Sequence, residues 1–475
     1  MRLRSLVVAL LGVCLISIPT PTRSQDGPPA SLDALLDGSA LHDIWLRINA
    51  QDWEQLHSNY SENTYYPADF EWQGIRVRNS GIRTRGRTTR NDHKPSLRVD
   101  FNRYVTGQRF LGVKALVLNS MWMDPSMLRD RLSMLVFQRV GIPAPRASHA
   151  RLFVGAERAF VGVYSVVEEV DTSFLEANFG EKDGYLYEYH PLDVYGLQDP
   201  GPSLDWYGLR FDPRTHESAS MADLYLPLRS MVEAVNDVPA SNLEDGLRDY
   251  LNIETFITEL AVQDFVAQQD GLLGQFGMNN FYLYRFAGTR LFQFIPWDQD
   301  GAFRLLTRLP WENIHTNVLA AKIWSEPRYR EAYLRKLLEI ADLVGAPAGT
   351  PTVDDPSIRA CPARPDTTPC AWLEQEVFRA YGQIRAAVHE DPLAPYPSDE
   401  FERDVALVQQ FARDRAGVVR QYVAEVAPEL VVGNGSRTLT SRSWNPGTVG
   451  AARDRPGAAL SGNYPIPNLP GRKPE

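Results

Sequence analysis

Phe294-Ile295-Pro296-Trp297-Asp298-Gln299-Asp300 has the pattern of a buried strand that ends at two carboxylates placed two residues apart. The stretches Phe281 to Phe286 and Arg290 to Ile295 predict the strand pair that leads to this end. Two such carboxylates can bind a hard cation, because magnesium takes oxygen ligands and usually keeps several waters and substrate phosphates. The alternative interpretation is a pair of solvated acids in a turn.

Helical patterns surround this strand pair in the second half of the chain. Five stretches place apolar residues at helical spacing: Met221 to Val235, Ile253 to Gln268, Lys322 to Leu343, Trp372 to Val388 and Phe401 to Val426. The second half of the chain is therefore predicted to be mainly helical.

The first half of the chain is dominated by strand patterns. Alternating apolar and polar residues predict strands over His42 to Ala50, Asp69 to Arg87, Ser96 to Phe101, Val113 to Asn119, Ala150 to Val154, Ala159 to Val167 and Gly184 to Tyr189. A single helix, Met127 to Val140, is predicted among them, because Asp124-Pro125-Ser126 precedes it and Gly141-Ile142-Pro143 follows it.

This order predicts an α+β chain with two lobes and a cleft between them, a type of cleft that cofactors favour. We place the sheet-rich lobe over 41–190 and the helix-rich lobe over 191–430. A linker is expected over 25–40. The Gly-, Ser-, Pro- and Arg-containing segment 431–475 is predicted to be a disordered tail.

An acid, an asparagine and a second acid follow one another in an informative order. The predicted helix ending at Gln268 leads to Asp270, then to a Gly-rich loop, then to Asn280 directly before a strand. In phosphoryl transfer an Asp orients the acceptor hydroxyl or accepts its proton, an Asn helps to hold metal, and a later Asp binds the ion that bridges the phosphates. Asp270, Asn280 and Asp298 can supply these three parts.

Phosphate contacts require basic residues, which the turn from Gly81 to Arg90 offers in number. We consider Arg83, Arg85 and Arg87 candidates for facing the cleft, with the alternative of a solvated basic hairpin. This turn resembles the phosphate-binding loop G-x-x-x-x-G-K-[ST], but Arg87 replaces the lysine and the following residues lead to a strand instead of a helix. A Walker-type NTPase is therefore excluded.

A lysine and an acid complete the candidate phosphate site. Lys94 could supply a point charge to a nucleotide phosphate, and Glu168, at the end of another predicted strand, could pair with it as kinases pair a lysine with an acid. Taken alone, Glu168 is more often a simple surface acid.

Other chemistries find little support in the sequence. No H-E-x-x-H pair, G-x-S-x-G elbow or clustered Cys/His set is present. A glycosidase could use two carboxylates and stack sugars on Trp122, Trp206, Trp297 or Trp311, although tryptophans are more often part of the core.

The N-terminus has the pattern of a secretory signal. Arg2 and Arg4 precede an apolar run from Leu6 to Ile18 and a short Pro- and Thr-containing stretch, so we expect residues 1–24 to be removed. The mature net charge is then about −13, which argues against a nucleic-acid partner. We expect no transmembrane helix and a secreted, periplasmic or cell-surface location.

Two cysteines, Cys361 and Cys370, remain after this processing. They lie close together in a Pro-rich loop, and an oxidising compartment favours joining them. A metal clip is the alternative.

Three stretches together resemble the CotH (spore coat protein H) family of atypical protein kinases over about Leu41 to Val426. They are Gly81 to Phe101, then Leu118 to Glu168 with its Asp124-Pro125-Ser126 and Gly141-Ile142-Pro143-Ala144 motifs, and finally Asn280 to Arg285 with Phe294 to Phe303. The last stretch is the most specific.

The resemblance implies a divergent two-lobed kinase-like fold, ATP with Mg²⁺ or Mn²⁺, and phosphorylation of Ser or Thr on partner proteins. Asp270 matches the catalytic acid of the family and Asp298 its metal-binding acid, with Asn280 and Asp300 as further metal candidates. In this sequence Gln268-Gln269 precede Asp270 and a Gly-rich insertion separates it from Asn279, whereas family members usually have an aromatic residue and Asn before the acid. The alternative function is therefore a catalytically inactive kinase-like surface or envelope binding and assembly protein.

Overall fold

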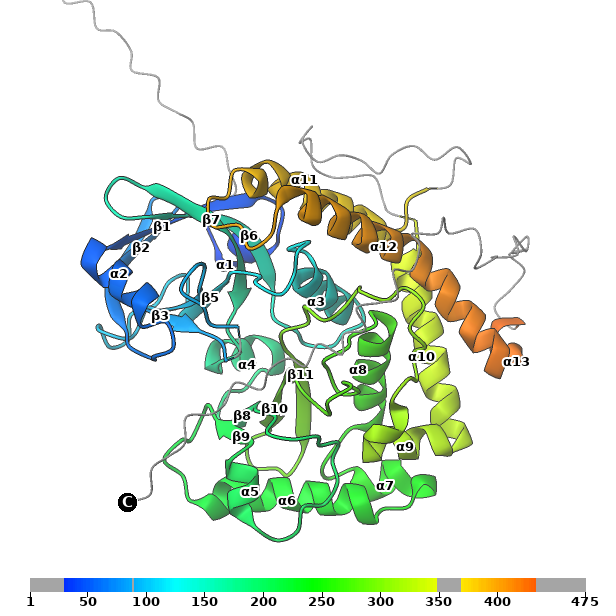
Figure 1. Ribbon diagram of the computed structural model, residues 1–475. Helices are drawn as coiled ribbons and strands as arrows, with labels where there is room; N and C mark the ends of the chain where they lie inside the picture. The colour runs from blue at the N-terminus through cyan, green and yellow to red at the C-terminus, as the bar shows by residue number, and fades with distance from the viewer. Residues whose placement is uncertain (1–29, 88, 348–368, 433–475) are drawn as a thin grey trace, which may run out of the picture.

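The computed structural model describes residues 30–87, 89–347 and 369–432 (Figure 1). The predicted signal peptide, Cys361 and the tail beyond Val432 lie outside these ranges. Cys370 is disulfide-bonded. Helix α1 (Leu32–Leu36) lies within the predicted linker and buries Leu35 and Leu36.

Seven strands of the first half close into a barrel in the order β1-β2-β3-β4-β5-β7-β6. All neighbouring strands are antiparallel except β1 and β6, which are parallel. The strands are β1 (Leu41–Ile48), β2 (Tyr66–Trp72), β3 (Ile75–Arg85), β4 (Ser96–Asp100), β5 (Ala115–Asn119), β6 (Ala147–Val154) and β7 (Ala159–Glu168). The barrel encloses its own apolar core, in which Phe70 packs edge-to-face on Phe101 and Phe110.

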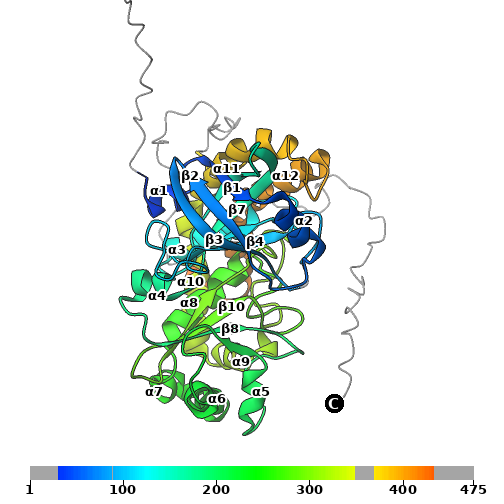
Figure 2. The same ribbon diagram turned by 90° about the vertical axis from the view of Figure 1, so that its left-hand side faces the viewer.

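A second sheet lies beside the barrel (Figure 2). It has four antiparallel strands in the order β11-β10-β8-β9. Its strands are β8 (Tyr185–Tyr189), β9 (Phe211–Pro213), β10 (Phe281–Arg285) and β11 (Phe292–Pro296). The predicted strand pair is β10 and β11, in which Phe281 lies opposite Pro296. Because β8 pairs with β10, the last strand of the expected sheet-rich lobe belongs to this second sheet.

Most helices pack around the second sheet or cross from it to the barrel, as Figure 1 shows for α11 and α12, whereas α2 packs against β2 of the barrel. They are α2 (Ala50–Ser58), α3 (Arg129–Arg139), α4 (Thr172–Phe179), α5 (Leu204–Gly208), α6 (Met221–Asp237), α7 (Leu243–Leu247), α8 (Ile253–Phe265), α9 (Val318–Ser325), α10 (Pro327–Gly345), α11 (Trp372–His389), α12 (Ser398–Val426) and α13 (Pro428–Val432).

The structure confirms the α+β class, and several boundaries differ for local reasons. The helix expected over Lys322 to Leu343 is two helices, because Pro327 lacks a backbone N–H and occupies the first turn of α10. The helix expected from Met127 begins at Arg129, since Met127 has a φ of +58°. Closure of the barrel was not predicted, and the two-lobed kinase-like arrangement stays a prediction. Among the described residues, no helix is long and apolar enough to cross a bilayer.

Helix α8 runs through the larger of the two main cores, and Phe256 to Phe265 are all buried. Glu259 is 0% exposed, and neither of its carboxylate oxygens has a hydrogen-bond partner among the described residues. Burial raises the pKa of Glu259 to about 8. The side chain is therefore mostly protonated in the folded protein at neutral pH.

Replacing this acid should change how stability depends on pH. Because the pKa of Glu259 is higher in the folded protein (about 8) than its ordinary value of 4.5, the unfolded chain loses the proton first as the pH rises. Stability is therefore lost between these two values, at up to about 1.4 kcal/mol per pH unit. We expect guanidinium denaturation to show that the unfolding free energy of Glu259→Gln, minus that of the parent protein, increases as the pH rises from 5 to 8.

The exposed Glu254 of the same helix provides the matched control, Glu254→Gln. A difference between Glu259→Gln and the parent protein that stays constant with pH would contradict this account.

Candidate active site

Asp270 follows α8 and is held by two asparagines. Its Oδ2 accepts hydrogen bonds from Asn279 Nδ2 at 2.9 Å and from Asn280 Nδ2 at 3.1 Å, and its carbonyl oxygen accepts from Asn280 Nδ2 at 2.9 Å. Its own N–H donates to Gln268 Oε1 at 3.0 Å. Burial raises the pKa of Asp270, and the hydrogen bonds from the two asparagines lower it in part. Both side-chain donors bind Oδ2, so Oδ1 is left for another partner.

The strand pair brings the second acid to the same place. Asn280 immediately precedes β10, and its carbonyl oxygen accepts the N–H of Trp297 at 3.1 Å. Asp298 is the next residue along the chain, and the charge of Asp270 is among the causes that raise its pKa. The structure therefore brings Asp270, Asn280 and Asp298 together.

Gly301 allows the two acid-bearing loops to pack closely. A Cβ atom at this position would lie 2.2 Å from Gln268 Oε1 and 3.6 Å from Asp270 Cβ. Only a residue without a side chain fits against Gln268, which explains the Asp-Gly sequence at the end of the acidic turn.

Backbone strain accompanies this convergence. Non-glycine residues with positive φ lie at the turns around the acids: Ala267 (+55°), Asn280 (+58°), Asp298 (+50°) and Phe303 (+59°). Each such residue costs about 1–2 kcal/mol, and strained backbone of this kind is concentrated at functional sites. The surrounding hydrogen bonds must hold these turns in place.

Two carboxylates, those of Asp298 and Asp300, lie at the strained turn, and Asp130 of α3 lies close enough for the charge of Asp298 to act on it. Burial raises the pKa of Asp298 to about 6, that of Asp130 to about 7 and that of Asp300 well above 3.8. The charge of Asp298 adds to the rise at Asp130 and at Asp300. No hydrogen bond or ion pair joins the carboxylates of Asp298 and Asp300 to another residue in the described ranges. Even partly buried acids without partners are costly, so the arrangement of Asp298 and Asp300 favours a positively charged ligand.

The chain does not supply a complete metal site. Within the described ranges, no group of three or more His, Cys, Asp or Glu side chains is arranged to hold a metal ion. The available donors are the carboxylates of Asp298 and Asp300 and the amide oxygen of Asn280, which accepts no hydrogen bond from a described residue. These hard oxygen atoms fit Mg²⁺ or Mn²⁺ if phosphate and water complete the coordination.

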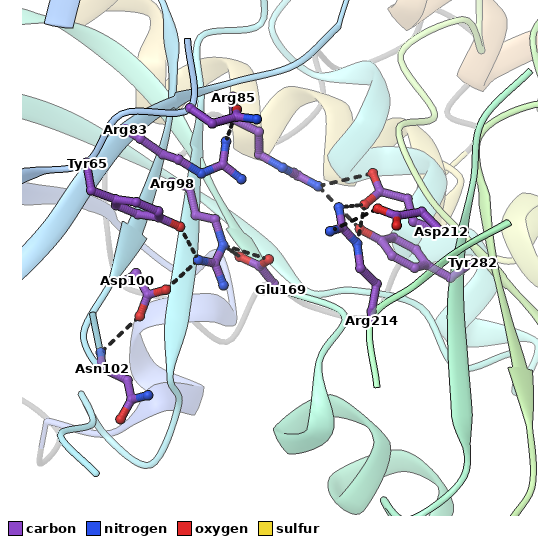
Figure 3. A network of polar contacts seen from close by, with 12 residues as sticks. Tyr65, Arg83, Arg85, Arg98, Asp100, Asn102, Glu169, Asp212, Arg214 and Tyr282 are labelled. Atoms are coloured by element: carbon purple, nitrogen blue, oxygen red, sulfur yellow. Dashed lines mark hydrogen bonds and ion pairs between the residues drawn. The ribbon is translucent and has the colours of Figure 1, made fainter. Parts of the chain in front are cut away.

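Among the basic residues predicted to contact phosphate, Arg85 is the one whose charge acts on Asp298. From β3 it donates to Tyr282 Oη at 3.3 Å, and it lies 3.9 Å from Glu188 of β8. Its guanidinium is 4.5 Å from the centre of the Trp297 ring, and its charge lowers the pKa of Asp298. Figure 3 shows Arg85 extending from the barrel toward Tyr282, beside the separate cluster of Arg98, Asp100 and Glu169.

The other predicted basic and acidic residues lie elsewhere. Arg83 donates to Asn63 Oδ1 at 3.2 Å and to the Thr84 carbonyl at 2.8 Å, and Arg87 is exposed. Glu168 accepts from Arg146, with Arg146 Nη2 at 2.7 Å from Glu168 Oε1. The suggested pairing of Glu168 with Lys94 is therefore corrected.

Lys94 instead pairs with Asp391, in the connection between α11 and α12. The distance from Nζ to Oδ2 is 2.7 Å, and both side chains are 0% exposed. Asp391 also accepts the N–H of Val163 at 2.8 Å. A Cβ on Gly162, whose φ is +128°, would lie 2.5 Å from Asp391 Oδ1, so glycine is required for this approach. The ion pair links the connection between α11 and α12 to the barrel, and the Lys94 ammonium is buried.

Sequence reasoning missed two residues, one at the site and one that pairs with the predicted phosphate-binding lysine. Asp130 lies in the first turn of a helix, where an acid is ordinarily explained by the helix dipole. Asp391 is 297 positions from Lys94, and no local pattern links them. The position of Asp130 next to the conspicuous Asp124-Pro125-Ser126 motif was the one available signal.

Breaking the buried ion pair should be strongly destabilising. Asp391→Asn leaves the Lys94 ammonium in the interior without its countercharge, which should lower the free energy of unfolding by about 3–5 kcal/mol in urea denaturation. Asp399→Asn is the matched control, because Asp399 pairs with Arg403 on the exposed face of α12, with side chains 73% and 69% exposed. The control should cost less than about 1 kcal/mol. Equal effects of the two substitutions would refute the structural role of Asp391.

Comparison with known proteins shows what this chain is similar to. The chain is 22% identical over 385 residues to the inner spore coat protein H of Bacillus subtilis (strain 168), covering 80% of this chain and 96% of that protein. The crystal structure of the Helicobacter pylori proinflammatory kinase CtkA is a weak match, with 9% identity, a TM-score of 0.25 and coverage of 80% of this chain and 97% of that one. A TM-score this low supports no conclusion.

The family comparison is decisive. The model of the CotH kinase protein family matches residues 82–344, more than half of the chain, and the match includes Asp270, Asn280 and Asp298. This protein belongs to the CotH kinase family.

Proposed function

We propose that this protein is an exported atypical kinase that transfers the γ-phosphoryl group of ATP to Ser or Thr of a partner protein. The observation that carries the proposal is the convergence of Asp270, Asn280 and Asp298, joined by the hydrogen bond from Asn280 to Asp270 and by that from Trp297 to Asn280. Membership of the CotH kinase family supports the same chemistry. Export rests on the signal pattern at the N-terminus.

In this proposal Asp270 orients the acceptor hydroxyl. The two asparagine amides hold Oδ2, which leaves Oδ1 to accept a hydrogen bond from a Ser or Thr hydroxyl and to receive its proton. Burial raises the pKa of Asp270, which makes its carboxylate a better base than an exposed aspartate.

Asp298, with Asn280 and Asp300, would hold a divalent cation. When bound, Mg²⁺ or Mn²⁺ neutralises the charge on the ATP phosphates. Arg85, whose side chain is 16% exposed, is placed to steady a phosphate beside Asp298. Lys94 has no part in phosphate contact in this proposal, because Asp391 and the protein interior enclose its ammonium.

A second function, a kinase-like binding or assembly protein without catalysis, is favoured by one specific observation. The lysine predicted to contact phosphate is 0% exposed. A scaffold that has lost nucleotide binding could keep this ion pair for stability alone.

Loss of Asp298 should abolish phosphoryl transfer. The purified protein with radiolabelled ATP and Mg²⁺ or Mn²⁺ should label itself or a generic protein substrate, and Asp298→Ala should reduce the rate by at least about 100-fold, because the metal would lose a charged ligand. Asp205→Ala, at the exposed start of α5, is the control and should retain parental activity. Labelling that survives in Asp298→Ala would refute the assigned role.

Nucleotide binding separates the two candidate functions. A ligand that binds only the folded state raises the free energy of unfolding by about 2.7 kcal/mol at a concentration one hundred times its Kd. ATP with Mg²⁺ should therefore raise the melting temperature of the parent protein and leave that of Asp298→Ala unchanged. An unchanged melting temperature of the parent protein would favour the binding protein.

A further inference from the structure

We infer that Asp130 is a positioning residue that fixes the turn carrying Asp298 and Asp300. This inference rests on the proposed function, and it adds a residue of α3 that neither the sequence pattern nor the family match assigns. The role would be structural support of the metal-binding acids, exerted through the backbone of Gln299.

The orientation of the Asp298 carboxylate must be determined by the backbone conformation of this residue. Its carboxylate has no hydrogen bond or ion pair to a described residue, so no side-chain contact of that kind holds it in place. Its φ of +50° is unfavourable for a residue with a side chain. The turn therefore depends on contacts made by its neighbours.

Gln299 supplies these contacts through its backbone N–H, its carbonyl oxygen and its side chain. Its N–H donates to Asp130 Oδ1 at 2.7 Å, and its carbonyl oxygen accepts the Ala302 N–H at 3.2 Å. Its side-chain Nε2 donates to the carbonyl of Trp297 at 2.9 Å. Gln299 is 0% exposed, so water cannot replace these partners. Ser133 of α3 also donates its Oγ–H to the Gln299 carbonyl, at the longer distance of 3.5 Å. The bond to Asp130 is therefore the shorter of the two that tie the turn to α3.

Helix α3 is itself a rigid support at this point. Arg129, the residue before Asp130, is 2% exposed and pairs with Asp124 at 2.6 Å and with Asp404 of α12 at 2.5 Å. The N–H of Arg129 also donates to Asp124 Oδ2 at 2.8 Å. Asp130 therefore lies at a helix start that is held by ion pairs on two sides. The short hydrogen bond from Gln299 to Asp130 holds the acidic turn against this helix start.

The chemistry of the bond makes the inference testable. An asparagine at position 130 can accept the same hydrogen bond through its amide oxygen but carries no charge. An alanine can do neither. A positioning role therefore predicts that Asp130→Asn behaves like the parent protein, whereas a direct role of the carboxylate predicts that it behaves like Asp130→Ala.

The first measurement is hydrogen–deuterium exchange of the Gln299 amide without nucleotide. Exchange should be about tenfold faster or more in Asp130→Ala, as expected for the loss of a hydrogen bond to a carboxylate, and should stay near the parental rate in Asp130→Asn. Asp130→Ser, which is too short to reach, serves if the alanine variant does not fold. Equal exchange in Asp130→Ala and the parent protein would overturn the inference.

The second measurement is steady-state kinetics with Mg²⁺ and ATP. Asp130→Ala should raise the KM for the metal-nucleotide complex by about tenfold or more, while Asp130→Asn stays within about threefold of the parent protein. Equal losses in both variants would overturn the positioning role and assign the carboxylate a direct one. A parent protein that neither turns over ATP nor binds Mn²⁺ in a spin-resonance titration would refute the proposed function as well, whereas an active parent with an unaffected Asp130→Ala variant would refute this inference alone.

Discussion

The hydrogen bond from Trp297 N–H to the Asn280 carbonyl closes the β10–β11 pair at the end where the acids lie, and the candidate site depends on it. It places Asp298 one residue beyond the last strand contact, beside the asparagine that donates to Asp270. The barrel, α3 and α12 then add supports around this fixed end. A shift of the strand register by one residue would move Asp298 to the other side of the sheet and separate the acids.

The electrostatics of the site explain why those supports are needed. Asp130, Asp298 and Asp300 are partly buried, and each has a raised pKa. The charge of Asp298 raises the pKa of Asp130 and of Asp300 further. Arg85 is the nearby cation that lowers the pKa of both Asp298 and Asp130, and Tyr282 and Trp297 hold its guanidinium. A divalent cation beside Asp298 and Asp300 would therefore offset the cost of ionising these carboxylates.

Much of the fold and part of the site were predictable from local patterns. Strand alternation, helical spacing and the Asp-x-Asp end of β11 are short-range signals, so the elements and the acids Asp270 and Asp298 could be predicted from them. Barrel closure and the Lys94–Asp391 pair depend on contacts between distant segments, which no local pattern encodes. Glu168 was matched to the wrong partner because charge and strand position alone do not distinguish Arg146 from Lys94.

Anomalous diffraction from crystals grown with Mn²⁺ and a non-hydrolysable ATP analogue tests the central claim most directly. The account predicts one manganese peak within bonding distance of an Asp298 carboxylate oxygen, bridged to the analogue's phosphates, with Asp270 facing the terminal phosphate. A nucleotide bound elsewhere, or manganese absent from Asp298 when the analogue is present, would contradict it.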